Sequence, residues 1–299
     1  MTQTRTAFIA IVGCPNVGKS SILNRLLGQK IAVVSPKPQT TRTKIMGVLT
    51  ENDVQLVFTD TPGFHRPRTK LGEKMVKAVS DSISGVDACL FVVEPSGELR
   101  DAEKDLLGKF KKEQMPVILA INKIDSVKQK ELLIERMAQF SALYDFEAIV
   151  PCSALKGDGF GELKDELFKQ SQPSPHFFPD DTLTDQPERV IAAEIIREKL
   201  LNLLDDEVPH GVAVCIERMH EREDSDITDI DATVYCERES HKGIIIGKKG
   251  EMLKKVSTRA REDMERFFMC KINLHCWVKV KEGWRNREGL IRNFGLDNE

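Results

Sequence analysis

The first stretch of this chain with recognisable chemistry is a loop suited to phosphate binding. It reads Gly13-Cys14-Pro15-Asn16-Val17-Gly18-Lys19-Ser20 and fits G-x-x-x-x-G-K-[ST] at each fixed position. Glycines let backbone N–H groups turn toward an anion, and the following helix adds its positive dipole end. In such loops the lysine reaches the β- and γ-phosphates, and the hydroxyl binds Mg²⁺. The predicted nucleotide-binding residues here are Gly13, Pro15, Asn16, Val17, Gly18, Lys19, Ser20 and Ser21.

Three later stretches supply polar groups for the rest of a nucleotide. In Asp60-Thr61-Pro62-Gly63, the Asp60 carboxylate can support Mg²⁺ and the Gly63 N–H can meet a γ-phosphate. Taken alone, that pattern is more often an ordinary turn. In Asn122-Lys123-Ile124-Asp125, the Asp125 carboxylate can accept two hydrogen bonds that guanine offers and adenine does not. Asn122 and Lys123 would brace the base, and Ser153-Ala154-Leu155 can offer guanine a backbone N–H.

The elements that must position these residues alternate between buried strands and helices. Apolar runs at 7–12, 54–59, 88–93, 117–121 and 148–150 predict strands, and 70–84, 101–112, 128–142 and 160–170 predict helices. This alternation predicts a mostly parallel sheet with helices on both faces. Functional residues of such a sheet lie at the carboxyl ends of its strands. Asp60 and Asn122 each follow a predicted strand, so the fold and the motifs agree.

The four motifs, in this order, resemble those of the translation-factor-related class of small GTPases. The resemblance covers residues 1–171 and implies a P-loop GTPase domain. A P-loop kinase or ATPase would have to account otherwise for Asn122, Lys123 and Asp125. Residues 35–44 form a polar loop suited to a nucleotide-dependent switch. The resemblance implies that Thr41, with Thr40 as second choice, binds Mg²⁺ together with Ser20 and Asp60, and that Lys19, Thr41 and Gly63 serve hydrolysis.

Two positions bear on the rate of hydrolysis. Phe64 stands where other GTPases place a glutamine that orients water, which implies slow intrinsic hydrolysis or the use of another group. Asn16 resembles a position that holds K⁺ near the phosphates in potassium-stimulated relatives. A loop asparagine that bonds its own backbone explains Asn16 equally well.

The remaining chain predicts a linker and an RNA-binding domain. Residues 172–187 are proline-rich and aperiodic, and the pattern of 188–299 predicts the order helix, strand, strand, helix, helix, strand. Within it, Ile246 precedes Gly247-Lys248-Lys249-Gly250, whose glycines permit close approach of a sugar-phosphate backbone. This resembles the GXXG loop of a KH domain of the prokaryotic type, an α+β fold that clamps single-stranded RNA. Lys254 and Lys255 would extend the basic face, although a solvated helix surface explains such lysines as well.

Charge and cysteine content fit this interpretation. Residues 181–240 carry 6 Lys and Arg against 17 Asp and Glu, whereas residues 241–299 carry 14 against 8. A basic segment beside an acidic one suggests a nucleic-acid face with a repelling flank. The seven cysteines include no C-x-x-C pair and predict free thiols in a reducing compartment. No apolar signal or spanning stretch occurs, so we expect a cytoplasmic protein.

A GTPase domain followed by this type of KH domain resembles the Era family. The likeness includes Gln39-Thr40-Thr41-Arg42 and the stretch Trp277-Val278-Lys279-Val280-Lys281-Glu282-Gly283-Trp284. It implies a monomeric GTPase that uses guanine nucleotide and Mg²⁺, with K⁺ as an option. It also implies binding to the 3′ region of 16S ribosomal RNA, a role in assembly of the small (30S) subunit, and partial peripheral association with the inner membrane face. A membrane-associated signalling switch whose KH domain binds protein is the alternative.

Overall fold

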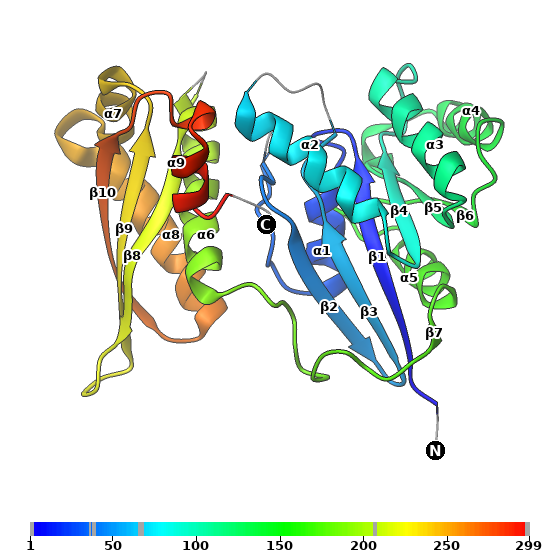
Figure 1. Ribbon diagram of the computed structural model, residues 1–299, viewed down its shortest axis with the longest axis horizontal. Helices are drawn as coiled ribbons and strands as arrows, with labels where there is room; N and C mark the ends of the chain where they lie inside the picture. Colours follow the sequence, from blue (N-terminus) through cyan, green and yellow to red (C-terminus); the bar gives the residue numbers. More distant parts are fainter. Residues whose placement is uncertain (1–2, 36, 38–39, 65–68, 206–207, 297–299) are drawn as a thin grey trace. The chain divides into compact units, whose positions relative to one another are not determined.

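The computed structural model describes residues 3–35, 37, 40–64, 69–205 and 208–296. The chain divides into two compact units, and along its main course the first ends at Asp185 and the second begins at Gln186 (Figure 1). None of the helices in the described part of the chain is both long and apolar enough to cross a membrane. All seven cysteines are free thiols.

The first unit is built on a sheet with the strand order β2-β3-β1-β4-β5-β6. All neighbours along this path are parallel except β2 and β3, which are antiparallel. The short strand β7 adds to β1 in antiparallel fashion. The strands are β1 (Arg5–Gly13), β2 (Ile45–Glu51), β3 (Val54–Asp60), β4 (Ala88–Val93), β5 (Val117–Ile121), β6 (Ala148–Pro151) and β7 (Gln172–Pro173).

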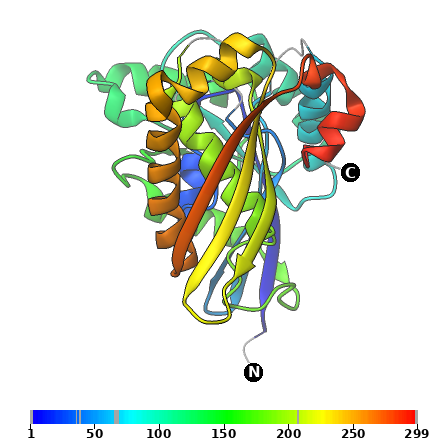
Figure 2. The same ribbon diagram turned by 90° about the vertical axis from the view of Figure 1, so that its left-hand side faces the viewer.

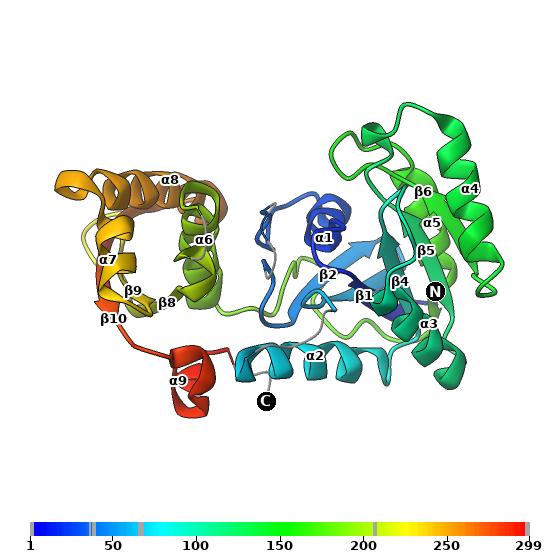
Figure 3. The same cartoon turned by 90° about the horizontal axis from the view of Figure 1, so that it is seen from above.

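Helices cover both faces of this sheet, as the alternating sequence pattern predicts (Figure 3). Helices α2, α3 and α4 pack on one face around Phe91, Phe110 and Phe140, while α1 lies against the other. Strand β4 is buried at every position because both of its faces are covered. The helices are α1 (Lys19–Leu27), α2 (Lys70–Ile83), α3 (Asp101–Glu113), α4 (Lys130–Ser141) and α5 (Phe160–Lys169).

Two features of this unit go beyond the sequence-based expectation. Strand β2 was not among the predicted elements. Most of the stretch predicted as a linker is bonded to the first unit: Gln55 Nε2 donates to Phe178 O at 2.9 Å, and Val48 N donates to Leu183 O at 2.9 Å. A buried glutamine that holds the backbone of a distant segment leaves no periodic signal in the sequence. Consequently the segment that remains between the units is shorter than residues 172–187.

The second unit has the predicted order of elements and a sheet with the strand order β10-β9-β8. Strands β8 and β9 are antiparallel, and β9 and β10 are parallel. Helices α6, α7 and α8 pack on one face of the sheet around a core that includes Ile196, Val234 and Val256. The elements are α6 (Glu188–Leu203), β8 (Ala213–Glu221), β9 (Ile227–Cys236), α7 (Glu239–Ile246), α8 (Glu251–Phe268), β10 (Lys271–Val280) and α9 (Glu288–Asn293). Short 3-10 turns occur at Ile124–Ser126, Val208–Gly211, Lys248–Gly250 and Trp284–Asn286.

Candidate nucleotide and RNA sites

The phosphate loop joins β1 to α1 in a conformation that requires its glycines. A Cβ atom on Gly13 would lie 2.3 Å from Val92 O, and one on Gly18 would lie 2.2 Å from Asn122 Nδ2. Both glycines also have positive φ, at 151° and 99°. The loop is therefore packed too closely, against β4 on one side and the Asn122 amide on the other, for any larger residue at either position.

Lys19 is buried beneath the loop, with a side chain that bonds to loop carbonyls. Its Nζ donates to Gly13 O at 3.1 Å and to Cys14 O at 3.0 Å. Burial lowers the pKa of Lys19, while the nearby Asp60 carboxylate opposes that shift. A cation held in this cradle is already positioned for the β- and γ-phosphates of a nucleotide in the loop.

The three residues expected at the metal lie together. Ser20 Oγ donates to Asp60 Oδ2 at 2.6 Å and lies 2.9 Å from Thr41 Oγ1, and Thr41 Oγ1 lies 3.4 Å from Asp60 Oδ2. Among the described residues, the buried Asp60 Oδ1 has no hydrogen-bond partner. Burial raises the pKa of Asp60 to about 6. Hard oxygen donors around a carboxylate with one unsatisfied oxygen fit Mg²⁺.

Geometry separates the two candidate threonines of the predicted switch. The Thr40 hydroxyl donates to Lys37 O at 2.6 Å, so it is engaged with its own segment. Only Thr41 reaches Asp60, which supports the first choice made from the sequence. Residues 36, 38 and 39 of this predicted switch lie outside the described residues, as do 65–68 after Gly63.

The base-recognition residues follow β5 and β6 and are braced against the phosphate loop. Asn122 Nδ2 donates to Val17 O at 2.9 Å, and Asn122 Oδ1 accepts from Ala154 N at 3.0 Å. Lys123 Nζ pairs with Glu94 Oε1 at 2.8 Å. Glu94 immediately follows β4, and sequence reasoning did not single it out. Its position at the carboxyl end of a buried strand was the signal that could have found it.

Asp125 and Ser153 meet at the predicted guanine position. Ser153 Oγ donates to Asp125 Oδ1 at 2.5 Å, which fixes the carboxylate. Asp125 lines one shallow hollow beside α4, and Ser21 and Ala154 line another beside α1. Ser153 and Ala154 hydrogen-bond to Asp125 and Asn122, and Leu155 is exposed.

Gly63 and Phe64 lie against the phosphate loop with different consequences. A Cβ on Gly63 would lie 2.7 Å from Pro15 Cα, so only glycine fits this approach. Phe64 N donates to Gly13 O at 3.1 Å, and its ring lies 4.8 Å from Lys109 Nζ on α3. The ring thus packs on the helix layer as a hydrophobic group. Asn16 has a positive φ of 65°, and Lys123 Nζ donates to its carbonyl oxygen.

In the second unit, the predicted clamp joins α7 to α8. A Cβ on Gly247, which has a φ of 73°, would lie 2.7 Å from Met252 Cβ. Gly250 has a φ of 82°, but a Cβ there would meet open space. Lys248 and Lys249 are exposed, while Ile246 is half-buried. Gly247 thus closes the turn, and Gly250 leaves an open surface between two exposed ammonium groups and the start of α8.

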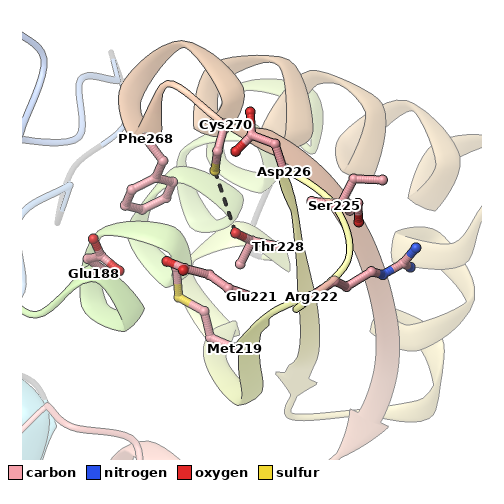
Figure 4. Close-up of a pocket in the computed structure, with 10 residues that line it drawn as sticks. Glu188, Met219, Glu221, Arg222, Ser225, Asp226, Thr228, Phe268 and Cys270 are labelled. Carbon is pink, nitrogen blue, oxygen red and sulfur yellow. Dashed lines mark hydrogen bonds between the residues drawn. The ribbon is translucent and has the colours of Figure 1, made fainter.

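The basic face extends along α8, where Lys254, Lys255 and Arg259 line a shallow hollow with Glu251, Thr258 and Glu262. A second hollow lies at the turn of the β8–β9 hairpin, near the end of α8 that is farther from the clamp (Figure 4). Glu188, Glu221 and Asp226 surround it, and Thr228 Oγ1 lies 3.5 Å from Cys270 Sγ inside it. Arg222 also lines the hollow, but its guanidinium is paired with Asp229, so the three carboxylates leave the hairpin end unfavourable for phosphate and RNA.

Comparison with known proteins identifies the family. The chain is 48% identical to the GTPase Era of Clostridioides difficile, with 99% of both chains covered, and 49% identical to that of Ruminiclostridium cellulolyticum, with 97% covered. The chain belongs to the Era family of GTPases. The predicted GTPase activity is thereby confirmed. Residues 8–123 match the family described as 50S ribosome-binding GTPase, and residues 207–285 match the KH domain.

Solved Era structures confirm the predicted fold. Era from Aquifex aeolicus, a variant bound to GDP·AlF4⁻, superposes with a TM-score of 0.94 at 37% identity and covers 98% of this chain and 99% of that one. Era in complex with MgGDPNP and nucleotides 1506–1542 of 16S ribosomal RNA superposes with a TM-score of 0.92 at 38% identity, with the same coverage.

Proposed function

We propose that this Era GTPase binds Mg²⁺ and guanine nucleotide at the motifs of the first unit. We further propose that it binds 16S ribosomal RNA near its 3′ end through the second unit and acts in assembly of the small ribosomal subunit. The observation that carries the nucleotide assignment is the convergence of Ser20, Thr41 and Asp60 beside the buried Lys19. The RNA assignment rests on the clamp geometry at Gly247 and Gly250 and on the RNA present in the solved Era complex.

The first unit's residues have distinct roles in GTP hydrolysis. Lys19 offers a positive charge to the β- and γ-phosphates, and the Gly63 N–H offers a hydrogen bond to the γ-phosphate. Ser20, Thr41 and Asp60 would hold Mg²⁺, which neutralises charge on the phosphate oxygens when bound. Phe64 cannot orient a water molecule, so hydrolysis should be slow until another group or a partner positions the water.

The base end of the site provides specificity for guanine. Asp125 would accept the N1–H and the 2-amino group of guanine, and Ser153 fixes the carboxylate in position. Adenine would leave this acceptor unpaired, a cost that discriminates strongly between the two bases. Asn122 links the base end of the site to the phosphate loop. The distance between these two ends is therefore set to the length of one nucleotide.

The RNA assignment is tested at Gly250 by two variants of equal bulk. Both Gly250→Asp and Gly250→Asn place a side chain in open space, and Asn and Asp tolerate a positive φ better than most residues. Gly250→Asp adds a charge that repels phosphate, so binding of an RNA containing 16S nucleotides 1506–1542 should fall much further than with Gly250→Asn. GTP affinity should be unchanged in both.

A second pair of variants tests the clamp lysines without backbone strain. Replacing Lys248 and Lys249 by Gln should weaken RNA binding and flatten its salt dependence, because two phosphate contacts are lost. Replacing the exposed pair Lys111 and Lys112 on α3 removes the same charge and should leave RNA binding unchanged. Equal RNA affinity in all four variants would indicate that the clamp does not bind the RNA.

The remaining assignments are parts of the same proposal. The protein acts as a monomer in the cytoplasm, because a single chain contains both sites. K⁺ near Asn16 and partial association with the inner membrane face rest on the family resemblance.

A further inference from the structure

Strand β10 presents two chemically different faces. Ile272, Leu274, Cys276, Val278 and Val280 pack against the helices of the second unit. The alternate residues point to the opposite face of the sheet, because successive side chains of a strand alternate. Figure 2 shows this opposite face of β10, β9 and β8, with helix α9 near one end. The outward residues of β10 are Lys271, Asn273, His275, Trp277 and Lys279.

Trp277 is the large aromatic residue among the outward residues of β10. Its side chain is 49% exposed, and the His275 ring lies 6.1 Å away at an interplanar angle of 31°. The second tryptophan, Trp284, is fully buried and donates from Nε1 to Gly211 O at 2.9 Å. Trp284 thus has a role in the core, whereas half of Trp277 remains in contact with water on a sheet face. An indole and an imidazole side by side are a surface on which nucleobases stack.

The charge along β10 favours a polyanion. No carboxylate occurs between Lys271 and Lys281, and Lys279 and Lys281 are exposed beside Trp277. The carboxylates that face this strand belong to β9 and have cationic neighbours. Arg222 binds Asp229 through two hydrogen bonds of 2.7 and 2.8 Å, and Asn273 also donates to it at 2.7 Å. In the sheet register, Asp231 lies between Arg218 and His275.

The two ends of β10 differ in charge, which gives a bound RNA strand a preferred direction along it. Helix α7, which ends at the clamp, packs against β10, and Lys281 N donates to Cys236 O at 2.8 Å just before that helix begins. The other end of β10 adjoins the acidic hollow of Figure 4, where Glu221 and Asp226 lie. Lysines near the clamp attract RNA phosphates, and the carboxylates at the hairpin repel them. The part of β10 available to RNA is therefore Lys281, Lys279, Trp277 and His275.

We propose that the outer face of β10 is a second RNA contact, on which unpaired bases next to the clamped nucleotides stack on Trp277 while Lys279 and Lys281 neutralise their phosphates. This inference rests on the proposed RNA binding of the same unit. It extends that binding around the edge strand of the sheet to the face opposite the helices.

Trp277 fluorescence tests the contact directly, because a stacked base quenches an indole. The full-length protein is titrated with an RNA of 16S nucleotides 1506–1542, while binding is measured separately by a mobility shift. The expected result is quenching that saturates together with binding. Trp277→Phe should abolish the quenching and keep the affinity, since a phenyl ring still stacks. Trp277→Ala should weaken binding roughly fivefold to a hundredfold, the range of one base–aromatic stack.

Charge variants test the phosphate half of the proposal. Replacing Lys279 and Lys281 by Gln should lower the slope of log affinity against log salt by about 1.4, since each single-strand phosphate contact contributes about 0.7. The matched Lys111 and Lys112 replacement should not change the slope. Of two RNA series shortened from opposite ends, the one that removes the bases beside Trp277 first should lose quenching before it loses binding to the clamp, and the other should not.

The outcomes separate this inference from the proposed function. Normal RNA binding without quenching, with equal affinity for Trp277→Ala, overturns the β10 contact and leaves the clamp assignment intact. Binding that resists Gly250→Asp but needs Trp277 overturns the clamp as the primary site. Absence of RNA binding by the unaltered protein overturns both, and would point to a protein partner on the Trp277 face.

Discussion

The side chain of Asn122 donates from Nδ2 to the carbonyl oxygen of Val17 across 2.9 Å. This bond joins the loop that follows β5 to the phosphate loop that follows β1. The other end of the same amide accepts from Ala154 N, so three loops from different strands share one side chain. The distance between the phosphate-binding and base-binding ends of the site is therefore fixed by packing before a nucleotide enters.

Asn122→Asp should weaken GTP and GDP equally. The carboxylate still accepts from Ala154 but faces the Val17 carbonyl without a hydrogen to donate, at a cost of about 1–3 kcal/mol. Nucleotide affinity should accordingly fall about fivefold to a hundredfold, with the preference for guanine unchanged. Titration with GTP, GDP and ATP checks this, and a loss confined to one of the two guanine nucleotides would contradict the bracing role.

Asp125→Asn should change which base is accepted. The amide no longer accepts from both guanine donors, but it can donate to the 2-oxo group of xanthine. GTP affinity should fall at least about tenfold, and xanthosine triphosphate should become the better ligand. Asp158→Asn, in the same hollow, is the matched control and should keep GTP preference. Unchanged GTP affinity in Asp125→Asn would remove Asp125 from the guanine site.

Thr41→Ala should separate GTP from GDP. Its hydroxyl lies beside Ser20 and Asp60, where it would sense Mg²⁺ together with the γ-phosphate. We expect GTP affinity and turnover to fall about tenfold or more while GDP affinity changes little. Thr41→Ser keeps the hydroxyl and should retain most of both. An equal loss of both nucleotides in Thr41→Ala would argue against a γ-phosphate sensor.

Binding of Mg²⁺ with nucleotide should weaken in acid because of Asp60. Burial raises its pKa from 3.8 to about 6 in the free protein, so the carboxyl is protonated below that value. Affinity should fall up to about tenfold per pH unit below pH 6 and level off above pH 7. In Asp60→Asn, the pH dependence of affinity that remains comes from the nucleotide's own phosphates. Parallel pH profiles of affinity for the two proteins would contradict the assignment of this dependence to Asp60.

The raised pKa of Asp60 makes the folding stability of the free protein change with pH in the opposite direction to ligand affinity. A carboxyl whose folded pKa is raised favours the folded state at low pH, and this contribution is lost as pH rises from about 4 to 6. Adding Mg²⁺ and GDP should therefore stabilise the protein more at pH 7 than at pH 5. Thermal denaturation at both pH values, with and without ligand, provides that comparison.

Potassium should stimulate GTP turnover if Asn16 helps to hold a cation. The expected result is a higher rate in KCl than in NaCl at equal ionic strength, and loss of this difference in Asn16→Ala. Nucleotide affinity without potassium should be retained, because the phosphate loop keeps its backbone contacts. A turnover rate that does not depend on the monovalent cation would leave Asn16 as a residue that shapes the loop.

The sequence alone determined the order of elements and the placement of chemistry on them. Strands β4 and β5 are uniformly apolar, so a parallel sheet covered on both faces was predictable, and Asp60 and Asn122 had to follow its strands. The glycines at 13, 18 and 247 were predictable for the same local reason, since the loop patterns demand a close backbone approach. These features depend on neighbours a few residues apart.

Only the tertiary structure decided which groups meet across the chain. The adjacent Thr40 and Thr41 have the same chemistry, yet only Thr41 reaches Asp60. Gln55 binds the backbone at Phe177 and Phe178, more than a hundred residues later, and so attaches a stretch whose prolines indicated a linker. Trp277 and Trp284 occur in one short motif, but packing buries one and exposes the other. Such outcomes depend on contacts between distant segments, and local periodicity carries no record of them.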